Sequence, residues 1–170
     1  MRARRARSTD AGAIHALISY YAAEGILLPR TEENVREHVR GFLVLEEKGE
    51  IAGCVALENY GTELAEIRSL AVSPKFRKRG LGARLVQYAI LEARRQKTAR
   101  VFAVTHAPEF FTRQGFGTSA RHTLPEKIAR DCSVCPKVRR CRLVAVIATV
   151  IPERVALPIL NDVAASSPAA

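Results

Sequence analysis

The sequence contains no tryptophan, one methionine, four cysteines and no long apolar run. A helix that spans a membrane needs ~18 or more consecutive apolar residues. No stretch of the chain reaches that length, so we expect a soluble protein without a membrane partner. The apolar core of a secretory signal is also missing. The four cysteines are therefore expected to be reduced thiols of a cytoplasmic protein rather than disulfide partners.

Acidic residues are scarce relative to basic ones. The chain has 17 Asp and Glu against 27 Lys and Arg, which gives a net charge of +10. Such a surface favours an anionic partner, of which nucleic acid is the most common. Basic and aromatic residues are not interleaved as they are on RNA-stacking surfaces, so we expect no nucleic acid and favour a small molecule that carries phosphates. With 170 residues, of which 48% are hydrophobic, the chain can form one domain with a substantial core.

The first eight residues contain four arginines and no acidic side chain. Organelle-targeting segments can have this composition. Here the alternation of arginine and alanine leads directly into Ser8-Thr9-Asp10, which is a helix-capping sequence. We therefore favour a first strand over a targeting segment.

Apolar residues recur at helical or strand spacing along most of the chain. The pattern predicts helices from Asp10 to Gly25, from Thr31 to about Arg40, from Gly82 through Ala93 and over 108–113, and strands over 42–46, 51–57, 64–72, 100–105 and 143–150. Residues 121–141 are polar, basic and cysteine-bearing, and we interpret them as a loop insert. Residues 1–151 are expected to form one domain, followed by a C-terminal tail over 152–170.

The segment from Leu70 to Leu85 is the most informative feature of the chain. A strand pattern stops at Pro74, which cannot donate to a sheet. Gly80 and Gly82 then allow the backbone to approach a ligand closely, immediately before a helix begins. The basic side chains around them are Arg77, Lys78, Arg79 and Arg84. A strand, a basic glycine turn and a helix N-terminus together predict a polyphosphate site.

In this form the turn closely resembles the acetyl-CoA pyrophosphate loop of the GNAT acetyltransferases, Arg/Gln-x-x-Gly-x-Gly/Ala. The predicted order β-α-α-β-β-β-α-β-α-β also matches the GNAT fold, an α+β (mixed α/β) architecture with a mixed central sheet splayed around acetyl-CoA and flanked by helices. The resemblance implies acetyl-CoA as co-substrate, bound by Leu70, Ala71, Val72, Arg77, Lys78, Arg79, Gly80, Leu81, Gly82 and Ala83. The alternative is a basic surface turn that only caps a helix.

Residues 25–30, 65–74, 110–116 and 124–127 resemble the acetyltransferase domain of the N-acetylglutamate synthases, in its short, stand-alone form. The resemblance implies transfer of acetyl to the α-amine of an acidic amino acid. L-glutamate is the expected acceptor, giving N-acetylglutamate for arginine biosynthesis. The substrate-binding residues implied by motif are Arg30 for a carboxylate, Leu28 through its backbone N–H, Ser69 through a backbone amide, and Arg139. The serine of the family's Arg-x-Ser pair is missing near Arg139, which leaves another acidic or polar amino acid open.

Glu66 and Thr105 are the candidate catalytic residues. Glu66 shares a predicted strand face with Arg68, and a carboxylate inside a sheet is costly unless it has a partner. It is therefore either the base that deprotonates the amine, directly or through water, or a member of a structural ion pair. The resemblance implies the base. Many GNAT enzymes protonate the leaving thiolate with a tyrosine, but Phe111 stands at that position here. Thr105 remains as a proton donor, with water as the alternative.

Cys132, Cys135 and Cys141 form a partial metal pattern, because a structural zinc needs four ligands. His106 or His122 could supply the fourth. We interpret the segment as a reduced cysteine-bearing loop, so zinc is possible but not expected. Two other functions remain open: a GNAT enzyme for another amine, and a non-enzymatic module that binds acetyl-CoA or nucleic acid. A homodimer is also possible.

Overall fold

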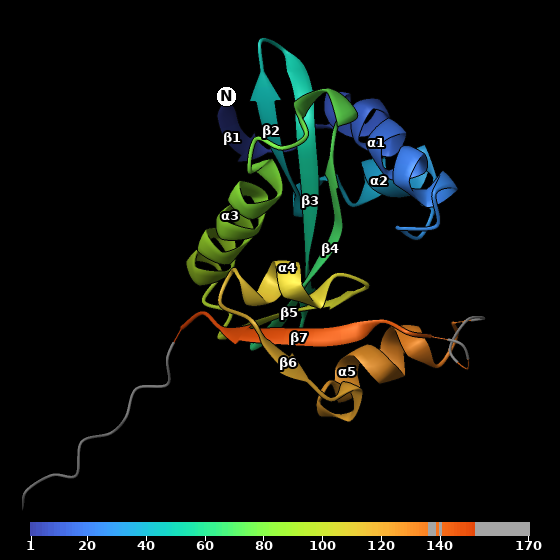
Figure 1. Cartoon of the computed structure of the whole chain (residues 1–170), viewed down its shortest axis with the longest axis vertical. Coiled ribbons are helices and arrows are strands. Elements are labelled where there is room, and N and C mark those ends of the chain that lie inside the picture. Colours follow the sequence, from blue (N-terminus) through green and yellow to red (C-terminus); the bar gives the residue numbers. More distant parts are fainter. Residues whose placement is uncertain (136–138, 140, 152–170) are drawn as a thin grey trace, which may run out of the picture.

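A computed structural model describes residues 1–135, 139 and 141–151 of the chain, and in these residues seven strands form one mixed sheet (Figure 1). The predicted tail over 152–170 lies outside the described residues. The strands are β1 (Arg2–Arg5), β2 (Phe42–Glu47), β3 (Glu50–Tyr60), β4 (Leu64–Val72), β5 (Arg100–Thr105), β6 (Gly117–Ser119) and β7 (Val144–Thr149). Their order in the sheet is β1-β2-β3-β4-β5-β7-β6. The expected mixed central sheet is thus confirmed, with β6 as a strand that the sequence pattern did not predict.

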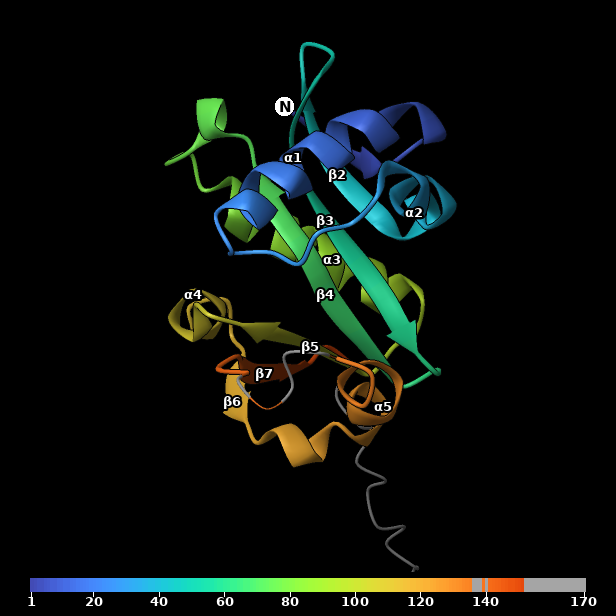
Figure 2. The same ribbon diagram turned by 90° about the vertical axis from the view of Figure 1, so that its right-hand side faces the viewer.

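The sheet splits between β4 and β5. These two strands are parallel, and they pair only from Leu64 opposite Arg100 to Glu66 opposite Phe102. Beyond this point β4 keeps its antiparallel partner β3, whereas β5 pairs along its whole length with β7. Figure 2 shows the two halves of the sheet diverging, with β4 steep and β5 nearly horizontal. The carboxyl-terminal half of β4 therefore has one open edge among the described strands.

A β-bulge bends β4 within this open half. Cys54 faces Ala71 and Ala56 faces Arg68, so β4 carries one more residue than β3 over the same interval. The extra residue lies next to Ser69, whose φ of +50° is uncommon for any residue except glycine. The bulge thus lies just after the split, in the part of β4 that does not pair with β5.

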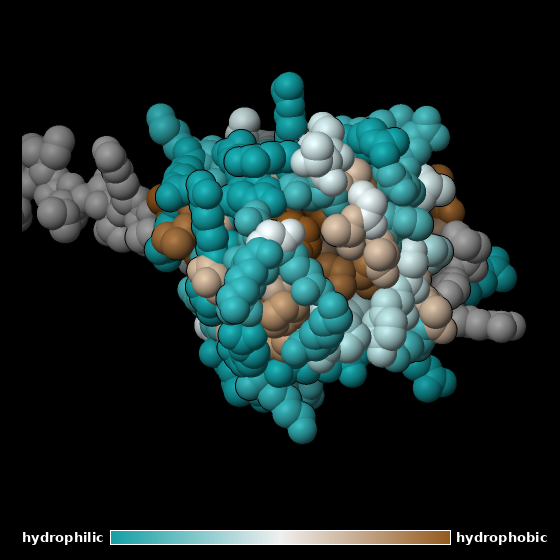
Figure 3. Space-filling model, turned by 90° about the horizontal axis from the view of Figure 1, so that it is seen from above, coloured by the Kyte–Doolittle hydropathy of each residue, from teal (hydrophilic) through white to brown (hydrophobic). Residues whose placement is uncertain are grey.

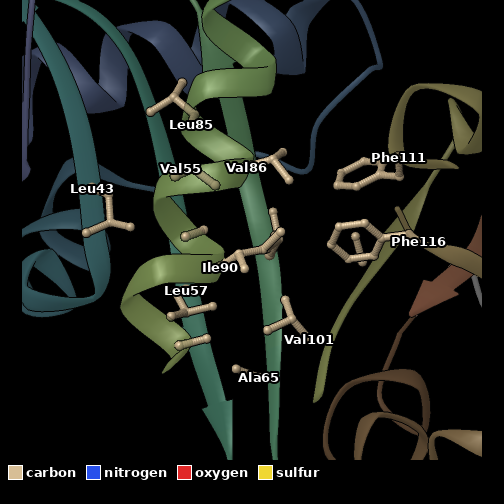
Figure 4. Packing of buried hydrophobic residues seen from close by; sticks show 14 of the residues in the cluster. Leu43, Val55, Leu57, Ala65, Leu85, Val86, Ile90, Val101, Phe111 and Phe116 are labelled. Atoms are coloured by element: carbon tan, nitrogen blue, oxygen red, sulfur yellow. The ribbon is translucent and has the colours of Figure 1, made fainter. Parts of the chain in front are cut away.

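Helices cover both faces of the sheet. α1 (Ala11–Ala23) and α2 (Glu32–Glu37) lie on one face, where Ile14 and Ile18 are fully buried. α3 (Leu81–Arg95) lies on the other face, and α4 (Pro108–Thr112) adjoins the β5 half. The positions buried along α3 recur every three or four residues, as an amphipathic helix requires. The apolar ones are Leu81, Leu85, Val86, Ala89, Ile90 and Ala93, and the polar Glu92 is buried as well. Figure 4 shows this apolar stripe packed against the sheet, with Phe111 and Phe116 closing the cluster from the β5 half.

The prediction of a loop insert over 121–141 is wrong for part of the segment. After a turn at Arg121–Thr123, α5 (Pro125–Lys127) begins and continues as a wider helical turn through Ile128–Cys132. Proline at the first helical position and an acid in the first turn both favour a helix start. The sequence nevertheless predicts a loop, because the segment has almost no apolar stripe. Leu124 anchors it to Tyr60 and the β5 half, and the remaining contacts with the sheet are largely ionic.

The other boundaries agree with the pattern to within a few residues. The second helix is shorter than predicted, because a 3₁₀ turn over Val39–Gly41 replaces its last residues. Among the described residues, no helix is long and apolar enough to cross a bilayer.

Candidate active site

The turn between β4 and α3 presents a helix N-terminus to the outside. Gly80 caps α3 with φ of +69°, in the left-handed region that favours glycine. Helix geometry leaves the N–H groups of Leu81, Gly82 and Ala83 without acceptors inside the helix. The helix dipole adds partial positive charge at the same end. These predicted residues therefore come together in an arrangement that fits a phosphate-bearing ligand.

The basic side chains of the turn are engaged with neighbouring elements. The Arg77 guanidinium lies 3.3 Å from the Tyr21 phenolic oxygen through both Nε and Nη2, and it stacks over the ring of Tyr20. Arg79 forms a two-pronged ion pair with Glu47 on β2, at 2.9 and 3.2 Å. Both pairs are exposed, so a phosphate can compete for these cations at small cost.

Lys78 is also exposed and has a left-handed φ of +62°. This bends the turn sharply immediately before Gly80. Gly82 occupies an ordinary helical position, and a Cβ added there would lie 3.4 Å from the ring of Phe110 on α4. The start of α3 and the start of α4 therefore approach each other across the split in the sheet.

The open edge of β4 continues from this turn into the molecule. Leu70 and Val72 are partly exposed, while Ala71 is buried between them. Backbone amides at an unpaired strand edge can donate to a ligand that lies alongside. Figure 3 looks down on this end of the molecule and shows apolar atoms in a recess ringed by hydrophilic ones. The surface suits a ligand with an anionic head and a less polar arm, as acetyl-CoA has.

Glu66 lies at the point where β4 and β5 separate, and it is 3% exposed. Its Oε2 accepts a hydrogen bond from the Tyr60 hydroxyl at 2.7 Å and another from the Lys127 ammonium at 2.8 Å. The Arg68 guanidinium, the partner expected from the sequence, is farther away at 3.7 Å. Glu66 is thus part of an ion pair, but mainly with a lysine from the segment predicted to be a loop.

The contacts of Glu66 extend into a charged cluster on the α1–α2 face of the sheet. Asp131 accepts from the Tyr60 hydroxyl at 2.8 Å, from Arg68 at 3.2 Å and from Lys127. Arg68 also donates to Glu58 at 2.9 Å. The cluster consists of the cations Arg30, Arg68, Lys127 and Arg130 and the anions Glu58, Glu66 and Asp131. With four positive groups and three negative ones the cluster has a net positive charge, which favours binding of an additional anion.

Burial and charge shift the pKa values in this cluster. Burial alone would raise the pKa of Asp131, but hydrogen bonds from Lys127 and Tyr60 and the charge of Arg68 hold it at about 2. Burial, and then the neighbouring Glu66 charge, raise the pKa of the Tyr60 phenol well above its ordinary value. Tyr60 therefore stays protonated and acts as a hydrogen-bond donor to the carboxylates.

Arg30 lies at the edge of the cluster, in the connection between α1 and α2. Its side chain is 14% exposed, 3.9 Å from Glu58, and its guanidinium stacks over the ring of Phe42. Burial and the nearby Arg68 charge lower its pKa, although guanidinium remains charged at any physiological pH. A hollow of about 210 Å³ opens beside Arg30, between residues 38–42 and β3, with His38, Arg40 and Glu58 among its walls.

The remaining predicted residues are more scattered. Ser69 carries the left-handed φ of the bulge, and Leu28 is exposed in the same connection as Arg30. Thr105 ends β5, where its Oγ1 accepts from the N–H of Ala107 at 3.0 Å and leaves its own proton available. Arg139 is exposed and lies between residues outside the described part.

The four cysteines lie in the described part of the chain and form no disulfide with one another. Cys54 is buried in β3, and burial raises the pKa of its thiol to about 12. Cys132, Cys135 and Cys141 are partly exposed. Within the described part of the chain, no three His, Cys, Asp or Glu side chains come together as metal ligands would.

Tyr60, Lys127 and Asp131 lie next to Glu66 but are not among the site residues that the sequence predicts; nor are Glu58 and Arg130 of the same cluster. Tyr60 follows Glu58 at strand spacing on β3, and Glu58 pairs directly with Glu66. This strand register places Tyr60 and Glu66 on the same face of the sheet. The sequence alone does not give the register, because it depends on how the β3–β4 hairpin aligns. Lys127 and Asp131 are four residues apart in a short helix, a spacing that places them on one side.

Comparisons with known proteins agree with this arrangement. A family profile described as "Acetyltransferase (GNAT) family" matches residues 12–116. The chain is 42% identical over 146 residues to an uncharacterized N-acetyltransferase of Chlorobaculum tepidum, covering 86% of this chain and 94% of that protein. It is 38% identical over 130 residues to an amino-acid acetyltransferase of Neisseria meningitidis, covering 75% of this chain but only 30% of that longer protein.

A solved structure with a similar fold is the N-acetylglutamate synthase of Neisseria gonorrhoeae, complexed with coenzyme A and N-acetyl-glutamate. It superposes with a TM-score of 0.80 at 32% identity, over 89% of this chain and 35% of that one. The shared part therefore includes both halves of the split sheet.

Proposed function

The chain belongs to the GNAT family of acetyltransferases, and from that premise we propose that it transfers the acetyl group of acetyl-CoA to the α-amine of an acidic amino acid, with L-glutamate as the expected acceptor. The product would be N-acetylglutamate, for arginine biosynthesis. The observation that carries the substrate proposal is the cationic excess around Glu66, with Arg30 and Arg68 on the side of the α1–α2 connection. Solved relatives support it, since the Neisseria gonorrhoeae synthase was obtained with coenzyme A and N-acetyl-glutamate.

Acetyl-CoA would bind along the open edge of β4. Its pyrophosphate would meet the N–H groups of Leu81, Gly82 and Ala83, and Arg77, Lys78 and Arg79 would add charge around it. The arm would run past Leu70 to Val72, where strand-edge amides can donate to the thioester oxygen. Bound in this way, acetyl-CoA supplies an acetyl thioester activated for attack by an amine.

The amino acid would bind on the α1–α2 side of Glu66. Arg30 offers two parallel N–H donors, which match a carboxylate and exclude a cationic amine side chain from the same place. The backbone N–H groups of Leu28 and Ser69 and the exposed Arg139 complete the proposed contacts. The hollow beside Arg30 leaves space for part of this substrate.

Glu66 would remove a proton from the substrate ammonium, directly or through a water molecule. The free amine then attacks the thioester carbonyl, a backbone amide of β4 stabilises the oxyanion, and the thiolate leaves. Thr105 has a hydroxyl proton available for that thiolate, and water is the other source. Tyr60 is already committed to two carboxylates and therefore stays out of this last step.

The test is release of free coenzyme A thiol from acetyl-CoA across the amino acids, polyamines and a lysine peptide, with the product identified by mass. We expect transfer to L-glutamate above all other acceptors. Glu66→Gln, which keeps the shape but cannot accept the proton, should lower turnover most at neutral pH and recover as the pH approaches the amine's own pKa. Preference for a cationic amine would overturn the acidic-substrate proposal. Failure to bind acetyl-CoA would overturn the proposed acetyl-transfer activity.

A further inference from the structure

We propose that Lys127 is a positioning residue for acetyl transfer: its ammonium holds Glu66 through Oε2, so that Oε1 faces the proton of the substrate amine in a fixed direction. The proposal rests on the proposed function of Glu66 as the base. It makes the helical segment 125–132, which the sequence pattern presents as a loop, part of the catalytic apparatus.

The two oxygens of Glu66 are in different situations. Oε2 accepts a hydrogen bond from the Lys127 ammonium at 2.8 Å and one from the Tyr60 hydroxyl at 2.7 Å. Oε1 accepts no hydrogen bond from the part of the chain that the structure describes. A carboxylate held at one oxygen by two donors has little rotational freedom, so its second oxygen keeps a fixed direction.

An ionised glutamate with 3% exposure is costly unless a cation is bound directly to it. Lys127 is itself 8% exposed, so water screens the pair only weakly. Arg30 and Arg68 are also nearby cations. Arg30 lies beside Glu58, Nη1 of Arg68 is bound to Glu58 and Asp131, and Nε of Arg68 stays 3.7 Å from Glu66. Among the described residues, Lys127 is thus the cation that donates a hydrogen bond to Glu66.

Lys127 is more than an anchor for its segment, because other residues attach that segment to the sheet. Leu124 packs with Tyr60 in a buried cluster. Arg130 stacks on the Tyr60 ring with 3.5 Å to the centroid and donates to Glu58 at 2.8 Å. The segment therefore has attachments that do not involve Glu66, and these provide a matched control.

The charged and titratable groups around Glu66 come from four parts of the fold. β3 contributes Tyr60 and Glu58, β4 contributes Arg68, the α1–α2 connection contributes Arg30, and the segment 125–132 contributes Lys127 and Asp131. Asp131 is held ionised by the same ammonium. Replacing Lys127 by a neutral residue would leave two carboxylates close to one phenol, and a carboxylate in that setting takes up a proton more readily.

The test is the pH profile of kcat/KM for the best amine acceptor found in the substrate screen. In Lys127→Met the acid limb, which is the low-pH side of this profile, should move to higher pH by about one to two units. This size follows from the usual strength of charge-assisted hydrogen bonds. Turnover at neutral pH should fall about tenfold or more, while acetyl-CoA affinity stays the same. Lys127→Arg, which keeps the charge, should return the limb toward its original position. If Lys127→Met does not fold, Lys127→Gln takes its place, and the same shift of the acid limb is expected for it.

Arg130→Met removes a cation of the same segment that does not touch Glu66. It should lower the thermal midpoint and leave the acid limb in place. A double variant, Lys127→Met with Glu66→Gln, should be no slower than Glu66→Gln alone, because the two residues act together. An unmoved acid limb in Lys127→Met, or an equal shift in Arg130→Met, would overturn the positioning role while the substrate proposal stands. A wild-type chain that acetylates no amine would overturn both proposals.

Discussion

The phenolic oxygen of Tyr21 in α1 lies 2.6 Å from the carbonyl oxygen of Val72, the last residue of β4, and donates a hydrogen bond to it. The same phenol accepts from the Arg77 guanidinium in the turn that follows. One side chain of α1 thus connects the end of the open strand edge with the basic turn before α3. The position of that turn depends on a helix 50 residues earlier in the chain.

Tyr21→Phe should loosen the turn, because it removes the hydroxyl from both contacts and keeps the ring. We expect acetyl-CoA affinity to fall about three- to tenfold, from the usual ~0.5–1.5 kcal/mol of a hydrogen bond. Calorimetric titration measures this directly. Tyr20→Phe is the matched control, since Arg77 stacks over that ring but its hydroxyl makes no hydrogen bond with the described residues. Equal losses in both variants would contradict a role for the Tyr21 hydroxyl.

Gly82→Val should abolish acetyl-CoA binding through the turn. The added side chain would project between the first turn of α3 and Phe110, where even a Cβ lies 3.4 Å from the ring. The branched residue would therefore fill the space through which the helix amides reach a phosphate. Gly82→Ala is the milder control and should retain most of the affinity, with a stable helix. If the folded Gly82→Val variant bound acetyl-CoA with unchanged affinity in the titration, this position of the pyrophosphate would be refuted.

Arg30→Ala should weaken binding of the amino-acid substrate and leave acetyl-CoA binding unchanged. Loss of a charge-assisted contact costs roughly 1.5–3 kcal/mol, which corresponds to about a ten- to hundredfold rise in KM for glutamate. Glu58, its present neighbour, keeps Arg68 and Arg130 as partners, so the fold should tolerate the change. Steady-state kinetics are the measurement. Arg36→Ala, an exposed arginine paired within α2, should behave as wild type.

The same KM in Arg30→Ala as in the wild type would show that the substrate carboxylate is held elsewhere in the cluster. Arg30→Lys sharpens the test, because lysine keeps the charge but not the pair of parallel donors. An intermediate KM for this variant is the expected result.

Asp131 should make the stability of the protein depend on pH. Its folded-state pKa of about 2 lies below the ordinary 3.8, so the ionised carboxylate stabilises the fold above about pH 4, and this contribution is lost as the pH falls through about 2. Asp131→Asn should therefore lower the thermal midpoint at neutral pH, by about 2–4 °C for each kcal/mol lost. Near pH 2 the variant and the wild type should converge.

Thermal unfolding followed at several pH values makes this comparison. Glu63→Gln is its control, since Glu63 is exposed in the turn between β3 and β4 and forms no ion pair with the described residues. A difference between Asp131→Asn and wild type that stays constant from neutral pH to pH 2 would contradict the ionic role.

Elements with local signals can be predicted from the amino-acid sequence alone. A proline ends β4, a glycine in the left-handed region caps α3, and the helix behind it has a regular apolar stripe. These features depend on backbone sterics and on spacing, so they can be recognised without the rest of the molecule. They predict a polyphosphate site, whereas the GNAT fold, the acetyl-CoA turn and the roles of Glu66 and Arg30 follow from the family resemblance of these motifs.

The pairing of charged side chains, in contrast, depends on how distant parts of the chain pack together. Glu66 was expected beside Arg68, its neighbour along the strand, but its closest cation is Lys127, 61 residues later. The segment that carries Lys127 has a buried face made of charged groups, and hydrophobic patterns do not detect such a face. Ionic partners are fixed by register, by the bulge at Ser69 and by the split of the sheet, and these emerge only when distant strands pair.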